Sequence, residues 1–249
     1  MQAPATNKNK RPGCGQILAR GAVKVFLFGI LAALVLNPNL RIAYKQLRHT
    51  FEPERLIQPA FPSMQQVNRK IDRMIHDHPT GHSEVKIVER FVYKSVRYVS
   101  DYENWNNVEY WPSAEEVWHR RQEDCDGRAI LAVSILRSRG YHSAKLVVGL
   151  NHMWATVNEN EKEPSAPQQI VALLNPDANL SLEMEPKTRP AHFIRLAKAL
   201  VQPTALRETS TGIIADIPND RKLILGLLMI LLWYLPLRTP IPLAKRNPS

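Results

Sequence analysis

Two uncharged hydrophobic runs lie near the ends of the chain. The first covers residues 25–36, and the second covers residues 223–235 and reads LILGLLMILLWYL, without a polar face. A helix needs about 20 residues to cross a bilayer, and a helix that is apolar all round is out of place on the surface of a soluble protein. We predict a membrane helix or signal anchor over residues 21–36 and a second membrane helix over residues 223–237. The alternatives are a cleaved signal peptide for the first run and a buried terminal helix for the second.

Between these runs, apolar residues recur three and four positions apart, which is the spacing of a helix with one buried face. Ser113 and Glu116 form a capping box, and Gly140 is a typical helix stop. Four helices are predicted, and they begin after Ser63, after Ser83, after Ser113 and close to Cys125. We predict a loop over residues 101–112, whose aromatic side chains cover an edge of the core or line a groove for a peptide.

After Gly140 the pattern becomes typical of strands. Residues 145–149 and residues 170–174 each read as a short apolar strand. Residues 151–157 alternate between them, which places His152 on one face of a second strand, away from Met153. We therefore predict three strands, with a histidine on the middle one.

The net charge of +10 is carried mostly by the two tails. Residues 1–24 have five basic residues, residues 236–249 have three, and neither tail has an acid, whereas the chain between them has 25 basic and 23 acidic residues. Nucleic-acid binding needs a basic face on the folded body, so we predict no nucleic-acid partner. Basic flanks are typical of the cytoplasmic side of membrane helices, which predicts an extracytoplasmic body. The difference in positive charge between the two sides of the first run is reduced by four basic residues that follow it: Arg41, Lys45, Arg48 and Arg55.

Cys125 is the residue with the clearest chemical potential. A thiol in the first turn of a helix faces free backbone N–H groups and the positive end of the helix dipole, and both favour the nucleophilic thiolate. The neighbouring acids Asp124 and Asp126 oppose this, so a cationic partner is needed. The alternative is a cysteine that only packs. Cys14 lies in the basic tail and is predicted to be dispensable.

Cys125 is followed 27 residues later by His152, and Asn175 comes 23 residues after that, at the end of the third predicted strand. Thiol catalysis needs a nucleophile, an imidazole that takes its proton and a third group that orients the imidazole. The ordered triple Cys125, His152 and Asn175 offers this set.

The stretch from about residue 98 to 177 resembles the transglutaminase-like superfamily of papain-type cysteine enzymes, including the bacterial transglutaminase-like cysteine proteinases. The pieces that match are Trp111-Pro-Ser-Ala-Glu-Glu, Asp124-Cys125-Asp126-Gly127, Gly140-Tyr, His152-Met-Trp and Leu-Leu-Asn175-Pro-Asp-Ala. The resemblance implies Cys125 as nucleophile, His152 as base and Asn175 as the orienting residue. It also implies an α+β fold, in which the Cys-bearing helix packs on an antiparallel sheet and hydrophobic helices flank the core.

The chain departs from the family pattern at two positions. The family usually has glycine where this chain has Glu123, and usually has aspartate where it has Asn175. Asp177 is therefore the alternative third member of the triad. The oxyanion of the reaction would be held by the backbone N–H of Cys125 and one further donor, for which Trp111 is a candidate.

The function predicted from these residues is that of a membrane-anchored thiol enzyme, a cysteine peptidase that cleaves amide bonds through a thioester intermediate. A transamidase and a non-catalytic module that binds a peptide or glycan are the alternatives. The expected partners are a protein or peptide substrate and a bacterial inner membrane. No cofactor or metal is expected, because the three histidines of residues 76–82 read as part of a polar turn.

The predicted organisation has seven segments: a basic cytoplasmic tail at 1–20, a membrane helix or signal anchor at 21–36, a helical N-terminal part at 37–97, the catalytic core at 98–180, a helix and linker at 181–222, a membrane helix at 223–237 and a basic tail at 238–249.

Overall fold

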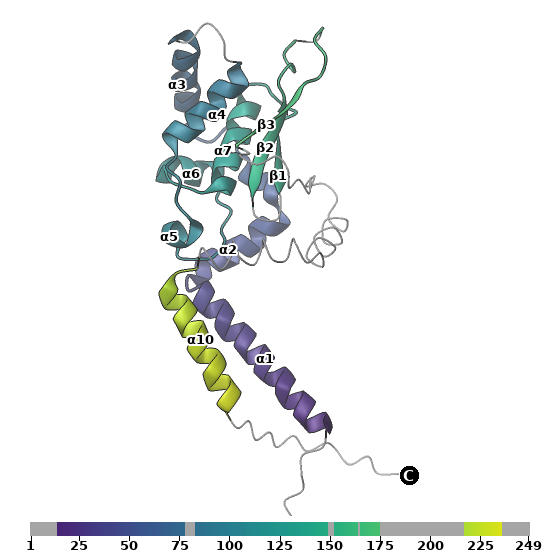
Figure 1. The fold of residues 1–249 in the computed structure, drawn as a ribbon. Coiled ribbons are helices and arrows are strands. Elements are labelled where there is room, and N and C mark those ends of the chain that lie inside the picture. Colours follow the sequence, from purple (N-terminus) through teal and green to yellow (C-terminus); the bar gives the residue numbers. More distant parts are fainter. Residues whose placement is uncertain (1–13, 78–82, 149–151, 164, 175–216, 236–249) are drawn as a thin grey trace, which may run out of the picture. The chain divides into compact units, whose positions relative to one another are not determined.

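The computed structural model describes residues 14–77, 83–148, 152–163, 165–174 and 217–235 (Figure 1). The chain divides into two compact units. One contains residues 1–36 and 219–249, and the other contains residues 37–218.

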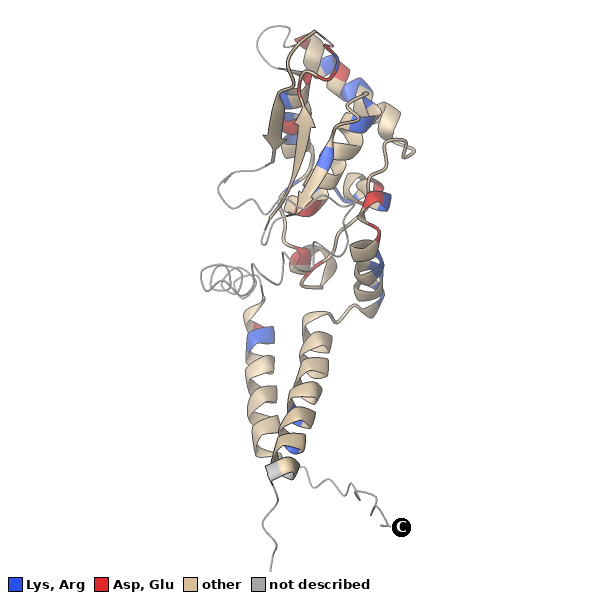
Figure 2. Ribbon diagram, turned by 90° about the vertical axis from the view of Figure 1, so that its right-hand side faces the viewer, with Lys and Arg blue, Asp and Glu red and all other residues tan. Residues whose placement is uncertain are grey.

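The first unit is a pair of helices, α1 (Cys14–Leu36) and α10 (Asn219–Tyr234), which pack against each other. Within α1, Ile17–Leu36 is long and apolar enough to cross a membrane, and no other helix in the described ranges meets that test. A signal sequence would have the same properties. Charged positions gather near one end of each helix (Figure 2). The Nζ of Lys24 donates a hydrogen bond of 2.8 Å to the carbonyl of Trp233, so this charge is satisfied within the pair.

Helix α1 begins before the predicted residue 21 because Arg20 and Lys24 interrupt the apolar run without stopping the helix. Helix α10 has 16 residues, fewer than the roughly 20 that a straight span needs. The second membrane helix, over residues 223–237, therefore stays a prediction.

The second unit begins with seven helical elements: α2 (Leu40–Phe51), the 3-10 helix η1 (Pro53–Leu56), α3 (Met64–Asp77), α4 (Glu84–Ser95), α5 (Asp101–Trp105), α6 (Ala114–Arg120) and α7 (Cys125–Ser138). Two of the predicted helix start signals are confirmed by hydrogen bonds of their side chains. The Ser83 side chain accepts a hydrogen bond from the backbone of Lys86, and Ser113 and Glu116 form a capping box. Gly140 has a φ of +90°, which suits the residue that follows the helix.

Among the described residues, three strands form one antiparallel sheet in the order β1-β2-β3. They are β1 (Lys145–Val148), β2 (Met153–Asn158) and β3 (Ile170–Leu173). The register pairs Ala155 of β2 with Leu146 on one side and with Leu173 on the other. Helices and an antiparallel sheet in one unit make the fold α+β.

Helix α7 is the centre of this unit. It packs against β2 on one side and against α3, α4 and α6 on the other (Figure 1). Its middle is buried on every face, and Ile130, Leu131 and Ile135 have no exposed surface. Because this core also includes α3 and α4 residues such as Val67 and Val88, residues 37–97 and the predicted catalytic core share one hydrophobic interior.

Two sequence predictions are wrong in detail. Part of the predicted loop 101–112 is helix α5, because acids in its first turn favour a helix start and Trp105 is buried. His152 lies just before β2 rather than on the strand, since pairing with β1 begins at Met153.

Candidate functional site

Cys125 is the first residue of α7, as the sequence predicts. Asp124 caps the helix, and its Oδ1 accepts a hydrogen bond of 3.2 Å from the backbone N–H of Asp126. Because Cys125 opens the helix, its own N–H has no carbonyl one turn earlier to which it could donate within α7. The side chain is half-buried, and its thiol is free.

The thiol lies against the start of β2. The backbone N–H of Met153 donates a hydrogen bond to the sulfur of Cys125, and α7 packs along β2. Met153 directly follows His152 in the chain, so the packing of α7 on the sheet brings Cys125 next to the segment that carries the predicted base.

The imidazole of His152 is held in one orientation. Its Nε2 is 2.7 Å from the carbonyl oxygen of Leu174, and its ring stacks on Trp154 with the centroids 6.1 Å apart and the planes 12° apart. A carbonyl can only accept a hydrogen bond, so Nε2 carries the proton. In the neutral ring Nδ1 then has the lone pair, which makes it the nitrogen that can take a proton.

Both backbone polar groups of Leu174 make hydrogen bonds to side chains. Its N–H donates a hydrogen bond of 2.8 Å to Oε1 of Glu89, and its carbonyl meets His152. Its φ of +61° is unusual for a residue with a side chain, and it turns the chain at the end of β3. Asn175 and Asp177, the two candidates for the third catalytic residue, lie outside the described residues. The structure thus brings together Cys125, His152 and the residue that precedes Asn175.

The electrostatics at Cys125 oppose the sequence-based expectation of a thiolate. Burial, the neighbouring carboxylate of Asp124 and, to a smaller extent, Glu109 and Asp101 together raise the pKa of the thiol to about 12. The N–H of Met153 acts in the opposite direction but does not outweigh them. The free site therefore holds a thiol at neutral pH.

Four carboxylates surround the start of α7, and their oxygens lie within 4.8 Å of one another: those of Asp101, Glu123, Asp124 and Asp126. Carboxylate oxygens are the ligands that Ca²⁺ and Mg²⁺ take in proteins, so this set could hold a cation, whereas the sequence predicts no metal site. Sequence reasoning missed the cluster because Asp101 and Glu123 are brought together only by folding.

Burial and the repulsion between neighbouring carboxylates raise the pKa values of three members of this cluster, Asp101, Glu123 and Asp126. Burial, followed by the charge of Asp124, raises the pKa of Glu123 to about 8 and also raises the pKa values of Asp101 and Asp126. Glu123 has no exposed surface, and its Oε1 accepts hydrogen bonds from Asn104, at 2.6 Å, and from the indole of Trp105. Glu123 stands where the resemblance expects glycine. Its buried carboxylate links α5 to the start of α7 through these hydrogen bonds.

Trp111, the candidate oxyanion donor, has both of its N–H groups engaged. Its backbone N–H donates to Gln46 at 2.7 Å, and its indole N–H donates to Glu109 at 2.6 Å. Its carbonyl accepts from Nδ1 of His49 at 2.7 Å. The indole could serve an oxyanion only after its bond to Glu109 opened.

Gly127 lets the segment after Trp111 approach the start of α7. A Cβ at this position would lie 2.5 Å from Cγ of Glu123 and 3.0 Å from Cγ of Pro112. Both distances are too short for carbon atoms in contact. Glycine is therefore required for Pro112 and Glu123 to pack here.

Arg128 is a cation that the sequence-based reasoning missed, although its position one turn after Cys125 could have indicated it. Its guanidinium lies 5.3 Å from the ring of Tyr93 and 5.1 Å from the ring of Tyr98, and donates to the carbonyl of Val96 at 2.6 Å. Burial lowers the pKa of Arg128, and its interactions with nearby groups, Cys125 among them, act against this. Arg128 is therefore a cation near the start of α7, but its charge does not offset the acids around the thiol, whose pKa is raised to about 12.

The aromatic loop is mostly part of the core. Trp105 and Tyr110 are buried and pack with Ile42 of α2 in a small cluster, so the groove interpretation is wrong for these two residues. Of the histidines at 76–82, His76 is exposed and faces Asp77 at 3.6 Å, while His78 and His82 lie outside the described residues.

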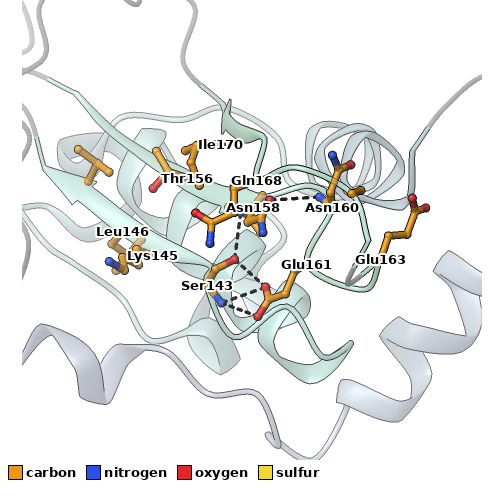
Figure 3. Close-up of a pocket in the computed structure, with 13 residues that line it drawn as sticks. Ser143, Lys145, Leu146, Thr156, Asn158, Asn160, Glu161, Glu163, Gln168 and Ile170 are labelled. Atoms are coloured by element: carbon orange, nitrogen blue, oxygen red, sulfur yellow. Dashed lines mark hydrogen bonds between the residues drawn. The ribbon is translucent and has the colours of Figure 1, made fainter.

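A cavity of about 650 Å³ opens on the sheet, away from the candidate site (Figure 3). It is lined by residues of β1, β2, the start of β3 and the segment between β2 and β3, including Thr156 and Ile170. On its floor Glu161 accepts hydrogen bonds from the backbone and hydroxyl of Ser143. Neither Cys125 nor His152 lines this cavity, and Ser143 also bonds to the backbone N–H of Asn158.

Replacing Asp124 by asparagine is expected to speed alkylation of Cys125. An asparagine can still cap α7, but the charge beside the thiol is lost, so the pKa of Cys125 falls. Each pKa unit gives about tenfold more thiolate below the pKa. The measurement is the iodoacetamide reaction rate between pH 7 and 10, in a Cys14→Ser background. The wild-type rate should rise throughout this range because the pKa of its thiol is about 12.

The matched control for this experiment is Asp77→Asn, which removes an exposed charge from the end of α3 and should leave the rate unchanged. Equal rates for Asp124→Asn and the wild type would show that Asp124 does not set the pKa of Cys125.

The sequence matches no protein-family model, and no curated protein matches it at a significant level.

Proposed function

We propose that this protein is a membrane-anchored cysteine peptidase of the transglutaminase-like type. The observation that carries the proposal is the position of the thiol. Cys125 opens α7 and accepts the N–H of Met153, while the adjacent His152 is oriented by Leu174. Amide cleavage by a cysteine enzyme needs a thiol, a base held in a suitable orientation and N–H donors such as those of a helix N-terminus.

Acylation uses the thiol together with its base. Because the pKa of Cys125 is raised to about 12, the proton moves to Nδ1 of His152 as the sulfur attacks the amide carbon. The N–H groups at the start of α7 stabilise the oxyanion that forms. His152 then gives its proton to the leaving nitrogen, the C–N bond breaks, and an amine departs from a thioester on Cys125.

Deacylation repeats these roles with water. His152 takes a proton from water as the water oxygen attacks the thioester carbon. When the C–S bond breaks, His152 returns this proton to the sulfur of Cys125. The net reaction converts an amide and water into an acid and an amine. An amine in place of water would give transamidation at the same site.

The resemblance to papain-type enzymes extends this proposal to the rest of the triad. Asn175 directly follows the residue whose carbonyl orients His152, so we assign it the third role and keep Asp177 as the alternative. We place the body on the extracytoplasmic side of a bacterial inner membrane, anchored by α1, because the tails are basic and free of acids.

Cleavage of a proteome-derived peptide library tests the proposal. The full-length protein in detergent should generate new peptide termini that Cys125→Ala does not. New termini in equal number with Cys125→Ala would refute it. Added amine that becomes joined to peptides would identify the transamidase, and bound but uncleaved peptides would identify the binding module.

A further inference from the structure

Helix α2 carries a row of exposed apolar side chains. Leu40, Tyr44 and Leu47 are 62%, 71% and 58% exposed, and Phe51 continues the row at 52%. At 100° per residue, these four positions lie within about 60° of arc on the helix. A folded protein in water rarely exposes such a continuous apolar row.

The opposite face of α2 is the one that packs on the body. Ile42 is buried against Trp105 and Tyr110, the Nζ of Lys45 pairs with Glu116 at 2.9 Å, and His49 bonds to Trp111. These residues lie about 130–190° around the helix from the centre of the apolar row. Contacts with the body therefore fix the helix with its apolar row outward.

The charges of α2 are all basic. The helix contains no acid, and Arg41 and Arg48 are exposed on the same side of the apolar row, about 70–90° from its centre. Such an arrangement is typical of a helix that lies in a membrane interface, where arginines reach lipid phosphates while the apolar row enters the acyl boundary.

The connection between α1 and α2 is short. Only residues 37–39 separate the end of α1 from Leu40, so the two ends are at most about 14 Å apart. Leu36 is the last residue of the segment that is apolar and long enough to cross a bilayer.

We propose that α2 lies on an anionic lipid surface, with Leu40, Tyr44 and Leu47 inserted and Arg41 and Arg48 on lipid phosphates. The proposal rests on the membrane anchoring of α1 and is independent of the thiol chemistry. Because α2 also contacts Trp111 through Gln46 and His49, lipid contact would fix the element that holds this segment of the candidate site.

The test uses the full-length chain with Cys14→Ser and Cys125→Ser, its intact N-terminus checked by mass. It is labelled with the fluorophore NBD at Leu47→Cys, and a matched protein is labelled at Gln66→Cys, an exposed position on α3. Both are reconstituted in vesicles of phosphatidylcholine with one-quarter phosphatidylglycerol. Lipid-borne nitroxides should quench the label at position 47 at least twofold more than that at position 66, and iodide should do the reverse.

A second variant tests the charges. Arg41→Gln with Arg48→Gln should reduce the lipid quenching at position 47 in these vesicles and leave it unchanged in phosphatidylcholine alone. Equal iodide access at positions 47 and 66 would overturn the proposal. Protection from both quenchers would also overturn it, because a second copy or another protein would then cover α2. Peptide cleavage is not the readout, so failure here leaves the proposed function standing.

Discussion

Replacing Cys125 by serine is expected to lower the rate of peptide cleavage by at least about 10³-fold, because the thiol is the nucleophile that forms the thioester intermediate. A hydroxyl is much less acidic than a thiol, and burial and acidic neighbours already raise the pKa of this position to about 12. Serine would therefore need to lose its proton where negative charge is strongly disfavoured. The loss is measured as kcat/KM on a peptide identified from the library.

The fold should tolerate this change. Serine is close to cysteine in size, and a helix start accepts it readily, so the Tm should stay within about 4 °C of the wild-type value. Cys14→Ser is the matched control and should retain full activity. If Cys125→Ser kept wild-type activity, or Cys14→Ser lost it, the nucleophile would have been assigned to the wrong cysteine.

Substitution of His152 by alanine should cost about 10²–10⁴-fold in kcat/KM, which is the range for loss of a general base. The effect is expected to be large because a thiol with a pKa of about 12 cannot attack without a proton acceptor. The loss is measured as kcat/KM on the peptide that is used for Cys125→Ser.

Two controls make the result on His152 specific. His119→Ala removes a histidine that is 66% exposed on α6 and pairs with Glu115, and it should leave the rate unchanged. Added imidazole should restore part of the activity of His152→Ala if the ring acts as a base. A loss equal to that of His119→Ala would remove His152 from the mechanism.

The sequence by itself determined the local elements that carry the site. Ser83 and Ser113 mark helix starts because their hydroxyls satisfy free backbone N–H groups close to them in the chain, and the structure has both caps. The pattern after Gly140 likewise predicts β1, β2 and β3, since short apolar runs and alternation are both local properties of the sequence. The position of Cys125 at the first turn of α7 follows in the same way.

Only the tertiary structure decided the chemistry around the thiol. Asp101 reaches the carboxylates beside Cys125 from a helix more than 20 residues earlier, and burial, which no spacing in the sequence reveals, raises the pKa of the thiol. The contact of His152 with Leu174 depends on how β2 and β3 pair. The sequence thus determined which groups are present and on which elements, whereas their protonation and contacts depend on long-range packing, because desolvation and Coulomb forces act through space rather than along the chain.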